Sequence, residues 1–208
     1  SAMPAGLAPS IQSGSPEVMD FVRMKNAGEI IFKNQANPEL KFKENTMVFT
    51  DPSFFSVFSF KLSRGDFHSV LSAPFSLIIS KKIQKKYFGN EDPVGKSLLC
   101  NNTYLYTVTG VLEDIPSNSS LNVDFISSLE TYPKLGNAEA QNWAKAGAFD
   151  TYLLLKSEQS TSRVLPVILE SGKKIGTFTD ETEYSLSQYS SQHLGGGFEK
   201  NTNARYVY

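Results

Sequence analysis

The sequence is poor in the residues on which most metal and redox sites depend. It has one cysteine, Cys100, and two histidines, His68 and His193. A single cysteine excludes an internal disulfide, and neither histidine belongs to an H-x-x-x-H or C-x-x-C pair, so no dedicated zinc site is expected. Cys100 lies in an apolar run, where a small buried hydrophobe is favoured over a nucleophile.

The sequence also lacks a surplus of charge of one sign and long apolar runs. Its 20 lysines and arginines nearly balance 21 aspartates and glutamates, which gives a net charge of −1. Proteins that bind nucleic acid usually carry a basic surplus, so no nucleic-acid partner is expected. No apolar run approaches the roughly 18 residues of a membrane-spanning helix.

The chain nevertheless has ample material for a folded core. Of its 208 residues, 40% are hydrophobic and 12% are aromatic. This composition is too apolar for a disordered chain, and the length indicates one large domain or two small ones.

Alternating apolar residues in the first third predict two hairpins followed by a short helix. The predicted elements are strands at 19–25 and 28–34, strands around 40–42 and 47–49, a helix at 54–58 and a strand at 60–62. The first pair of strands is expected to meet at the turn Asn26-Ala27-Gly28. The helix follows the start signal Asp51-Pro52-Ser53 and is apolar on one side, so we expect that side to pack into the core.

The stretch 76–125 has the densest run of structural signals. It predicts a buried strand at 77–79, a helix at 81–88 that Ser80 caps and Gly89 ends, and a hairpin of 98–100 with 104–111. Further strands are predicted at 123–126, 152–155 and 184–189, and a helix from Ser160 or Thr161 to about Gly172.

Gly95-Lys96-Ser97 resembles part of a nucleotide-binding P-loop. The motif requires four residues between its glycines, a preceding strand and a following helix. Here five residues separate Gly89 from Gly95, and the helix precedes while the strand follows. The pattern therefore favours a turn over a phosphate-binding loop.

Other short motifs have structural explanations that are more frequent than the functional ones. The lysines of the helix at 81–88 fit a solvated face better than a phosphate or lipid site. Arg64-Gly65-Asp66 matches an adhesion tripeptide, but three residues recur by chance and a turn is favoured. Glu113-Asp114 fits a solvated strand end. No G-x-S-x-G elbow is present, although a dispersed Ser-His-Asp set stays possible on the sequence alone.

Several of these segments, taken in order, resemble the MacB-like periplasmic core domain of MacB/FtsX-type ABC transporter permeases. The segments are Asp51-Pro52-Ser53-Phe54-Phe55, Ile79-Ser80-Lys81, Lys86-Tyr87-Phe88-Gly89, Asp92-Pro93-Val94-Gly95-Lys96, Tyr106-Thr107-Val108-Thr109-Gly110-Val111 and Asp114-Ile115-Pro116-Ser117-Asn118-Ser119. The resemblance covers most of 15–208 and is specific between 47 and 126.

The resemblance implies an α+β fold with two subdomains. Residues 1–50 and 121–208 would form a split βαβ-type, porter-like part near the membrane, and residues 51–120 an inserted mixed α/β distal part. The Arg205, Tyr206 and Tyr208 side chains at the end of the sequence suit a membrane interface. We therefore expect a domain on the periplasmic side of an inner-membrane protein.

The resemblance further implies a non-catalytic domain with no cofactor, metal or catalytic residues. A separate cytoplasmic ATPase would act on it through the membrane helices of a homodimeric or heterodimeric permease. The movement would serve export or a periplasmic adaptor or other periplasmic protein. Two alternatives remain open: a regulatory platform that activates a cell-wall hydrolase, as in FtsX-like permeases, and a hydrolase with a dispersed triad around His68 or His193.

Overall fold

The computed structural model describes residues 3–58, 60–113, 121–136, 149–182, 185–188 and 204–207, the last range for its backbone only. Its twelve strands form one sheet in the order β11-β12-β10-β1-β4-β9-β6-β8-β7-β2-β3, and β5 pairs with β8 beside this path. The architecture is α+β, as predicted.

The strands are β1 (Val18–Asn26), β2 (Ile30–Asn34), β3 (Lys41–Glu44), β4 (Met47–Thr50), β5 (Leu62–Arg64), β6 (Ser76–Ile79), β7 (Ser97–Cys100), β8 (Tyr104–Leu112), β9 (Phe125–Ser128), β10 (Asp150–Leu155), β11 (Leu186–Gln188) and β12 (Ala204–Val207). Some strands alternate buried and more exposed residues, as β2 does, whereas β4, β6 and β9 in the middle of the sheet are buried throughout. The helices are α1 (Leu7–Gly14), α2 (Phe54–Val57), α3 (Lys81–Phe88) and α4 (Thr161–Lys174), with 3-10 turns η1 (Leu129–Leu135) and η3 (Glu158–Ser160).

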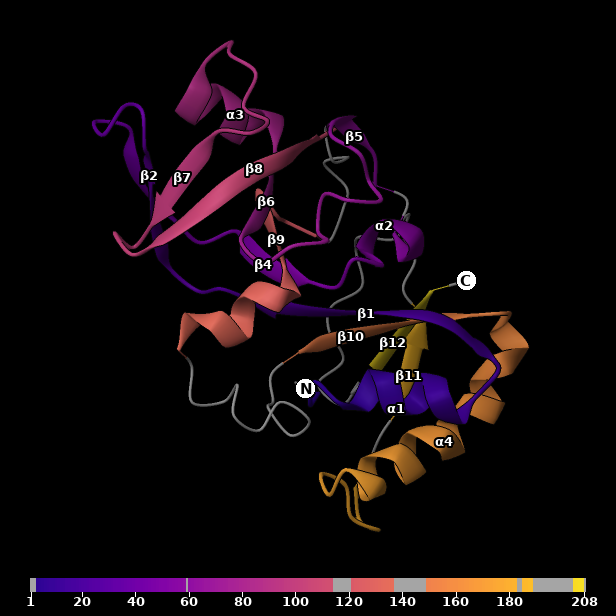
Figure 1. Cartoon of the computed structure of the whole chain (residues 1–208). Helices are drawn as coiled ribbons and strands as arrows, with labels where there is room; N and C mark the ends of the chain where they lie inside the picture. The colour runs from indigo at the N-terminus through magenta and orange to yellow at the C-terminus, as the bar shows by residue number, and fades with distance from the viewer. Residues whose placement is uncertain are drawn as a thin grey trace.

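Three apolar clusters fill the space between the sheet and its helices. Helices α1 and α4 pack together beside β1 and β10, where Leu7, Ile11 and Ile168 are buried. Figure 1 shows these helices on one side of the molecule and α3 on the other, with β1 and β10 crossing between them. Helix α1 and strand β12, the first and last elements of the chain, lie away from α3.

The other two clusters lie under α2 and α3. Helix α2 buries Phe54 and Val57 in one cluster with Tyr152, so its apolar side packs into the core as predicted. Helix α3 belongs to an aromatic cluster in which the ring of Phe32 lies 4.9 Å from that of Phe125 and 5.6 Å from that of Tyr106.

The predicted strands exist, but two predicted hairpin pairings are wrong. Strand β1 was predicted to pair with β2 but pairs with β10 and β4. Strand β3 was predicted to pair with β4 but pairs with β2, which also pairs with β7. The reason is that the strands serve different cores: Val22 of β1 packs with the α2 cluster, and Phe32 of β2 packs with the α3 cluster. The chain between them therefore crosses from one core to the other, and does not reverse on itself.

The central stretch matches its prediction closely. Strands β7 and β8 form the expected hairpin, and α3 has the predicted bounds. The strand predicted at 60–62 lies two residues later, as β5, and β12 was not predicted.

The division into 1–50 with 121–208, and 51–120, stays a prediction. Strand pairing bears on its boundary, because β2 joins β7 in an antiparallel ladder with Phe32 opposite Cys100. The hairpin of β2 and β3 therefore lies beside strands that the prediction gave to the other part.

Candidate functional site

The loop at 89–97 leads from α3 into β7 and has a fixed backbone. Gly89 and Gly95 adopt φ values of 62° and 84°. The Gly95 amide donates to the Val108 carbonyl over 2.8 Å, and the Val108 amide donates to the Lys96 carbonyl over 2.8 Å. Lys96 forms an ion pair with Glu91. These groups are engaged within the protein, so the loop is the turn that the sequence predicted and does not form a phosphate cradle.

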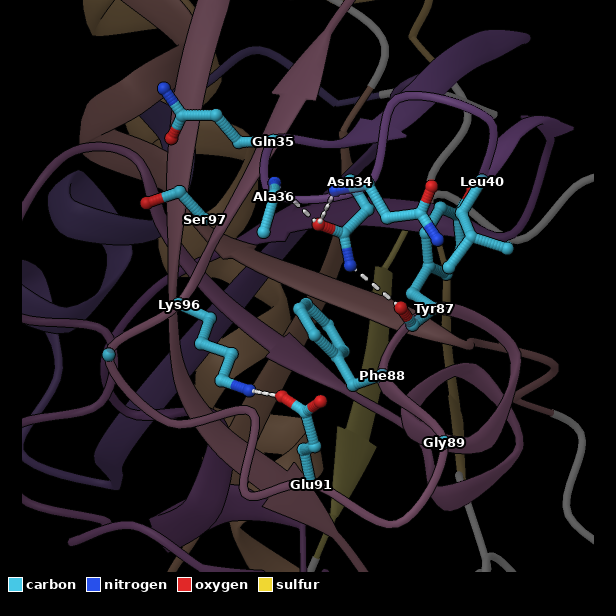
Figure 2. A pocket seen from close by; sticks show the side chains of 12 residues that line it. Asn34, Gln35, Ala36, Leu40, Tyr87, Phe88, Gly89, Glu91, Lys96 and Ser97 are labelled. Atoms are coloured by element: carbon cyan, nitrogen blue, oxygen red, sulfur yellow. Dashed lines mark hydrogen bonds and ion pairs between the residues drawn. The ribbon is translucent and has the colours of Figure 1, made fainter.

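An open groove of about 830 Å³ lies between this loop and the turn that follows β2 (Figure 2). Asn34 shapes one wall. Its Nδ2 donates to the Tyr87 carbonyl over 2.7 Å, while its Oδ1 accepts from the amides of Ala36 and Asn37. A single buried amide thereby joins the end of β2, its turn and the end of α3.

The chemistry of the groove is that of hydrogen bonding and packing. Its lining combines amide side chains such as Gln35 with the ring of Phe88 and the Lys96–Glu91 pair. None of its lining residues is a histidine or a cysteine, so Ser97 in the lining has no histidine there to activate it as a nucleophile.

Two buried carboxylates hold α3 in place. Asp124 accepts from the Ser80 hydroxyl over 2.7 Å and from the Lys82 ammonium over 2.8 Å, and the Ser80 hydroxyl accepts from the Ile83 amide. Ser80 is therefore the predicted cap. Burial pushes the pKa of Asp124 up, but the hydrogen bonds from Lys82 and Ser80 outweigh it, so the pKa is lowered.

The second carboxylate is Glu44, at the end of β3. Its Oε1 accepts from the Lys86 ammonium over 2.7 Å and from the Tyr87 hydroxyl over 2.8 Å. Burial raises the pKa of Tyr87, and the hydrogen bond to Glu44 raises it further. Two of the helix lysines, Lys82 and Lys86, therefore bind buried acids, while Lys85 lies in water.

Arg64-Gly65-Asp66 is a structural turn. Arg64 pairs with Asp92 at 2.8 Å, and the Asp66 carboxylate accepts from the His68 amide and the Ser69 hydroxyl. Its side chains are thus engaged within the domain. The φ of Gly65 is +95°, which a side chain rarely adopts.

The other candidate groups lie apart from one another. His68 is exposed and stacks on Phe67, with ring centroids 4.0 Å apart. Cys100 is buried, as predicted, and burial raises the pKa of its thiol to about 11. Glu113 is exposed, whereas Asp114 and His193 fall outside the described residues.

The residues that the structure describes include neither a cluster of metal ligands nor a membrane-spanning helix. No group of three or more histidine, cysteine, aspartate or glutamate side chains there could hold a metal ion. Within the same residues, no helix has the length and apolar character that crossing a membrane requires.

Sequence reasoning missed the groove and its Asn34. The only signal was local: an asparagine at the end of a strand often turns the chain by binding amides two or three residues on. Its bond to the carbonyl of Tyr87, 53 positions away, left no trace in the sequence.

Comparisons with known proteins agree with this fold. The family model described as the MacB-like periplasmic core domain matches residues 2–168. A domain of a permease protein from Porphyromonas gingivalis has a TM-score of 0.67 and 25% identity, over 88% of this chain and 74% of that chain. No curated protein matches.

Two further solved structures share the fold at lower identity. The periplasmic region of MacB from Actinobacillus actinomycetemcomitans has a TM-score of 0.62 and 16% identity, over 84% of this chain and 75% of that one. The extracellular domain of the ABC-type transporter YknZ from Gram-positive bacteria has a TM-score of 0.61 and 17% identity, over 82% of this chain and 84% of that one.

Fold and family together define an extracytoplasmic domain of a transporter permease. The chain belongs to the MacB-like periplasmic core domain family, as the sequence motifs indicated. Its porter-like α+β architecture is that of the permease domain and the MacB periplasmic region to which it is similar.

Proposed function

We propose that this domain is non-catalytic and carries motion from a cytoplasmic ATPase to the periplasmic space. The ATPase would be a separate subunit or domain that acts through the membrane helices of a dimeric permease in the inner membrane. The domain would then move as a rigid body and displace an exported substrate, or a periplasmic adaptor or other protein partner.

The continuous sheet is the observation that carries this proposal. One ladder of strands runs from β11, β12 and β10, near the chain ends, to β7, β2 and β3. Interlocked backbone hydrogen bonds along such a sheet resist bending within it, so displacement of one end moves the other. Buried pairs such as Arg23 with Asp51 stiffen its middle.

We further propose that the end of the sheet with α3 is distal to the membrane. The proposed distal part takes residues 51–120, together with the hairpin of β2 and β3 that pairs with β7. The remainder of 1–50 and residues 121–208 would form the part near the membrane. The groove at Asn34 then lies at the distal end, where a partner would meet it.

The test is a distance measurement in the full permease, with its ATPase, in lipid nanodiscs. Spin labels are placed at Asn90→Cys, on the exposed loop beyond α3, and at Met19→Cys, which is 58% exposed on β1. We expect the Asn90–Asn90 distance between protomers to change when ATP and vanadate are added. The Asn90–Met19 distance within one protomer should stay the same.

Three results would count against the proposal. An unchanged distance between protomers would show that the domain does not follow the ATPase. A changed distance within one protomer would show that it bends and is not rigid. Binding of ATP to the isolated chain with micromolar affinity, measured by calorimetry, would contradict a domain that depends on an ATPase elsewhere.

A further inference from the structure

Four strands at one end of the sheet, β8, β7, β2 and β3, bury only one of their faces. The buried side chains Phe32, Leu98, Cys100 and Tyr106 point toward α3. Since side chains alternate along a strand, their neighbours point the other way. The outward residues include Ile31, Lys33, Lys41, Lys43, Leu99 and Leu105, which we call the outer sheet face. Ser97 and Thr107, opposite each other on β7 and β8, border it.

The strand register places these six side chains next to one another. Leu99 is directly opposite Leu105 and also opposite Lys33, while Lys33 is opposite Lys41. Ile31 is opposite Lys43. Direct cross-strand neighbours lie about 5 Å apart at Cβ, so three aliphatic side chains adjoin a column of lysines.

This composition is unusual for a face left in water. Ile31 is 38% exposed and Leu105 is 44% exposed, so within the described chain no element covers them. A solvated sheet face normally carries polar residues at such positions. Clustered exposed aliphatic side chains are typical of surfaces that meet a partner.

The charge of the outer sheet face is opposite in sign to that of the whole chain. Lys43 forms an ion pair with Glu29 at 2.5 Å, with both side chains largely exposed. Lys33 and Lys41 have no carboxylate partner among the residues that the structure describes. Two lysines are therefore available to an acidic ligand, on a chain whose net charge is −1.

We propose that the outer sheet face docks an acidic, amphipathic segment of a partner protein. Its apolar side chains would cover Ile31, Leu99 and Leu105, while its carboxylates pair with Lys33 and Lys41. This inference rests on the proposed function, since it names the chemistry of the partner that the domain would move.

A protein segment fits this face better than a lipid surface or a second copy of the chain. Strand β3 is at the opposite end of the strand order from β10, β11 and β12, which lie nearest the chain ends. A family domain anchored at its ends would hold β3 away from the bilayer. A second copy bound face to face would bring two lysine columns together, and like charges oppose such a contact.

The test is a selection of displayed random peptides against the 208-residue chain in solution. We expect the selected peptides to combine aspartate or glutamate with aliphatic residues, and to bind more weakly at high salt. The double variant Lys33→Glu/Lys41→Glu should weaken binding by about tenfold or more. Leu105→Thr, which keeps a strand-forming residue, should also weaken it.

Lys85→Glu is the matched control, because it reverses an exposed lysine on α3, at the other side of the sheet. It should leave peptide binding unchanged. Thermal unfolding should show that all variants fold.

Three results would overturn the inference. One is the selection of basic peptides, or of peptides whose binding ignores the double variant. Another is binding to phosphatidylglycerol vesicles that the double variant abolishes, which would indicate a membrane contact. The third is self-association that Leu105→Thr abolishes. Since no ATPase is present, failure here leaves the distance test of the proposed function unaffected.

Discussion

The guanidinium of Arg23 and the carboxylate of Asp51 form a bidentate ion pair. Arg23 Nη2 lies 2.6 Å from Asp51 Oδ1, and Nε donates to Oδ2 over 3.0 Å. Nη1 donates to the Ala5 carbonyl over 2.8 Å, and the Arg23 amide donates to Oδ2. The pair thus ties the segment before α1 to β1 and to the end of β4, in the middle of the sheet.

Removal of one partner should destabilise the fold strongly. The Arg23 and Asp51 side chains are only 12% and 10% exposed, so Arg23→Ala leaves a buried carboxylate without its counter-ion. We expect a loss of about 3 kcal/mol in the free energy of unfolding, measured with urea. Arg64→Ala is the control: its pair with Asp92 is 50% and 56% exposed and should cost about 0.5 kcal/mol or less. A loss for Arg23→Ala as small as the one expected for the control would show that the central pair is not important for stability.

Asp124 should make stability depend on pH in the acid range. Because its pKa is lowered in the folded state, its contribution is present above the ordinary value of 3.8 and is lost as the pH falls below it. Asp124→Asn should therefore destabilise the fold by about 1 kcal/mol at neutral pH, and the difference from the natural chain should vanish at low pH.

Urea unfolding from neutral to acid pH measures this difference. Glu39→Gln is the control, since Glu39 is exposed on the turn before β3. A difference for Asp124→Asn that stays constant with pH would contradict the role assigned to its charge.

Substitution of two glycines should distinguish the cost of steric crowding from the cost of an unfavourable backbone conformation. A Cβ on Gly65 would lie 2.5 Å from the Thr109 carbonyl oxygen, whereas a Cβ on Gly28 would meet nothing within 4 Å. Both have positive φ, which costs a non-glycine residue about 1 to 2 kcal/mol. We expect Gly28→Ala to lose about that amount, and Gly65→Ala to lose about 3 kcal/mol because its neighbours must also shift. Thermal and urea unfolding measure both, and equal losses would contradict the crowding at Gly65.

Cys100 should be unreactive in the folded protein. Burial raises the pKa of its thiol to about 11, so little thiolate exists at neutral pH and reagents cannot reach it. We expect Ellman's reagent to label Cys100 only after urea unfolds the chain. The control is Asn90→Cys, whose exposed thiol should react at once. Rapid labelling of Cys100 under native conditions would show that the β7–β8 hairpin opens easily.

The local elements of the central stretch could be predicted because their signals act over a few residues. Ser80 binds the amide of Ile83, and Gly89 supplies the φ of 62° at which α3 ends. The β7–β8 turn likewise depends on Asn101 and Asn102, which both adopt positive φ. The same short-range logic identified Gly95-Lys96-Ser97 as a turn.

Strand partners could not be predicted from the same signals. A half-buried strand such as β1 fits beside any strand with a complementary buried face. Its actual partner, β10, lies more than a hundred positions away, with Phe21 opposite Leu153. Packing around α2 and α3 selected the pairs, and a pattern of alternation contains no information about that choice.

The sequence by itself determined the family, the positions of most elements and the end points of α3, because these follow from short-range backbone preferences and contiguous motifs. Only the tertiary structure decided which strands pair, where the Asn34 groove forms and which side chains share the outer sheet face. Those features join residues far apart in the chain, such as Lys33 with Leu99, and they exist only once the long-range packing has set the register.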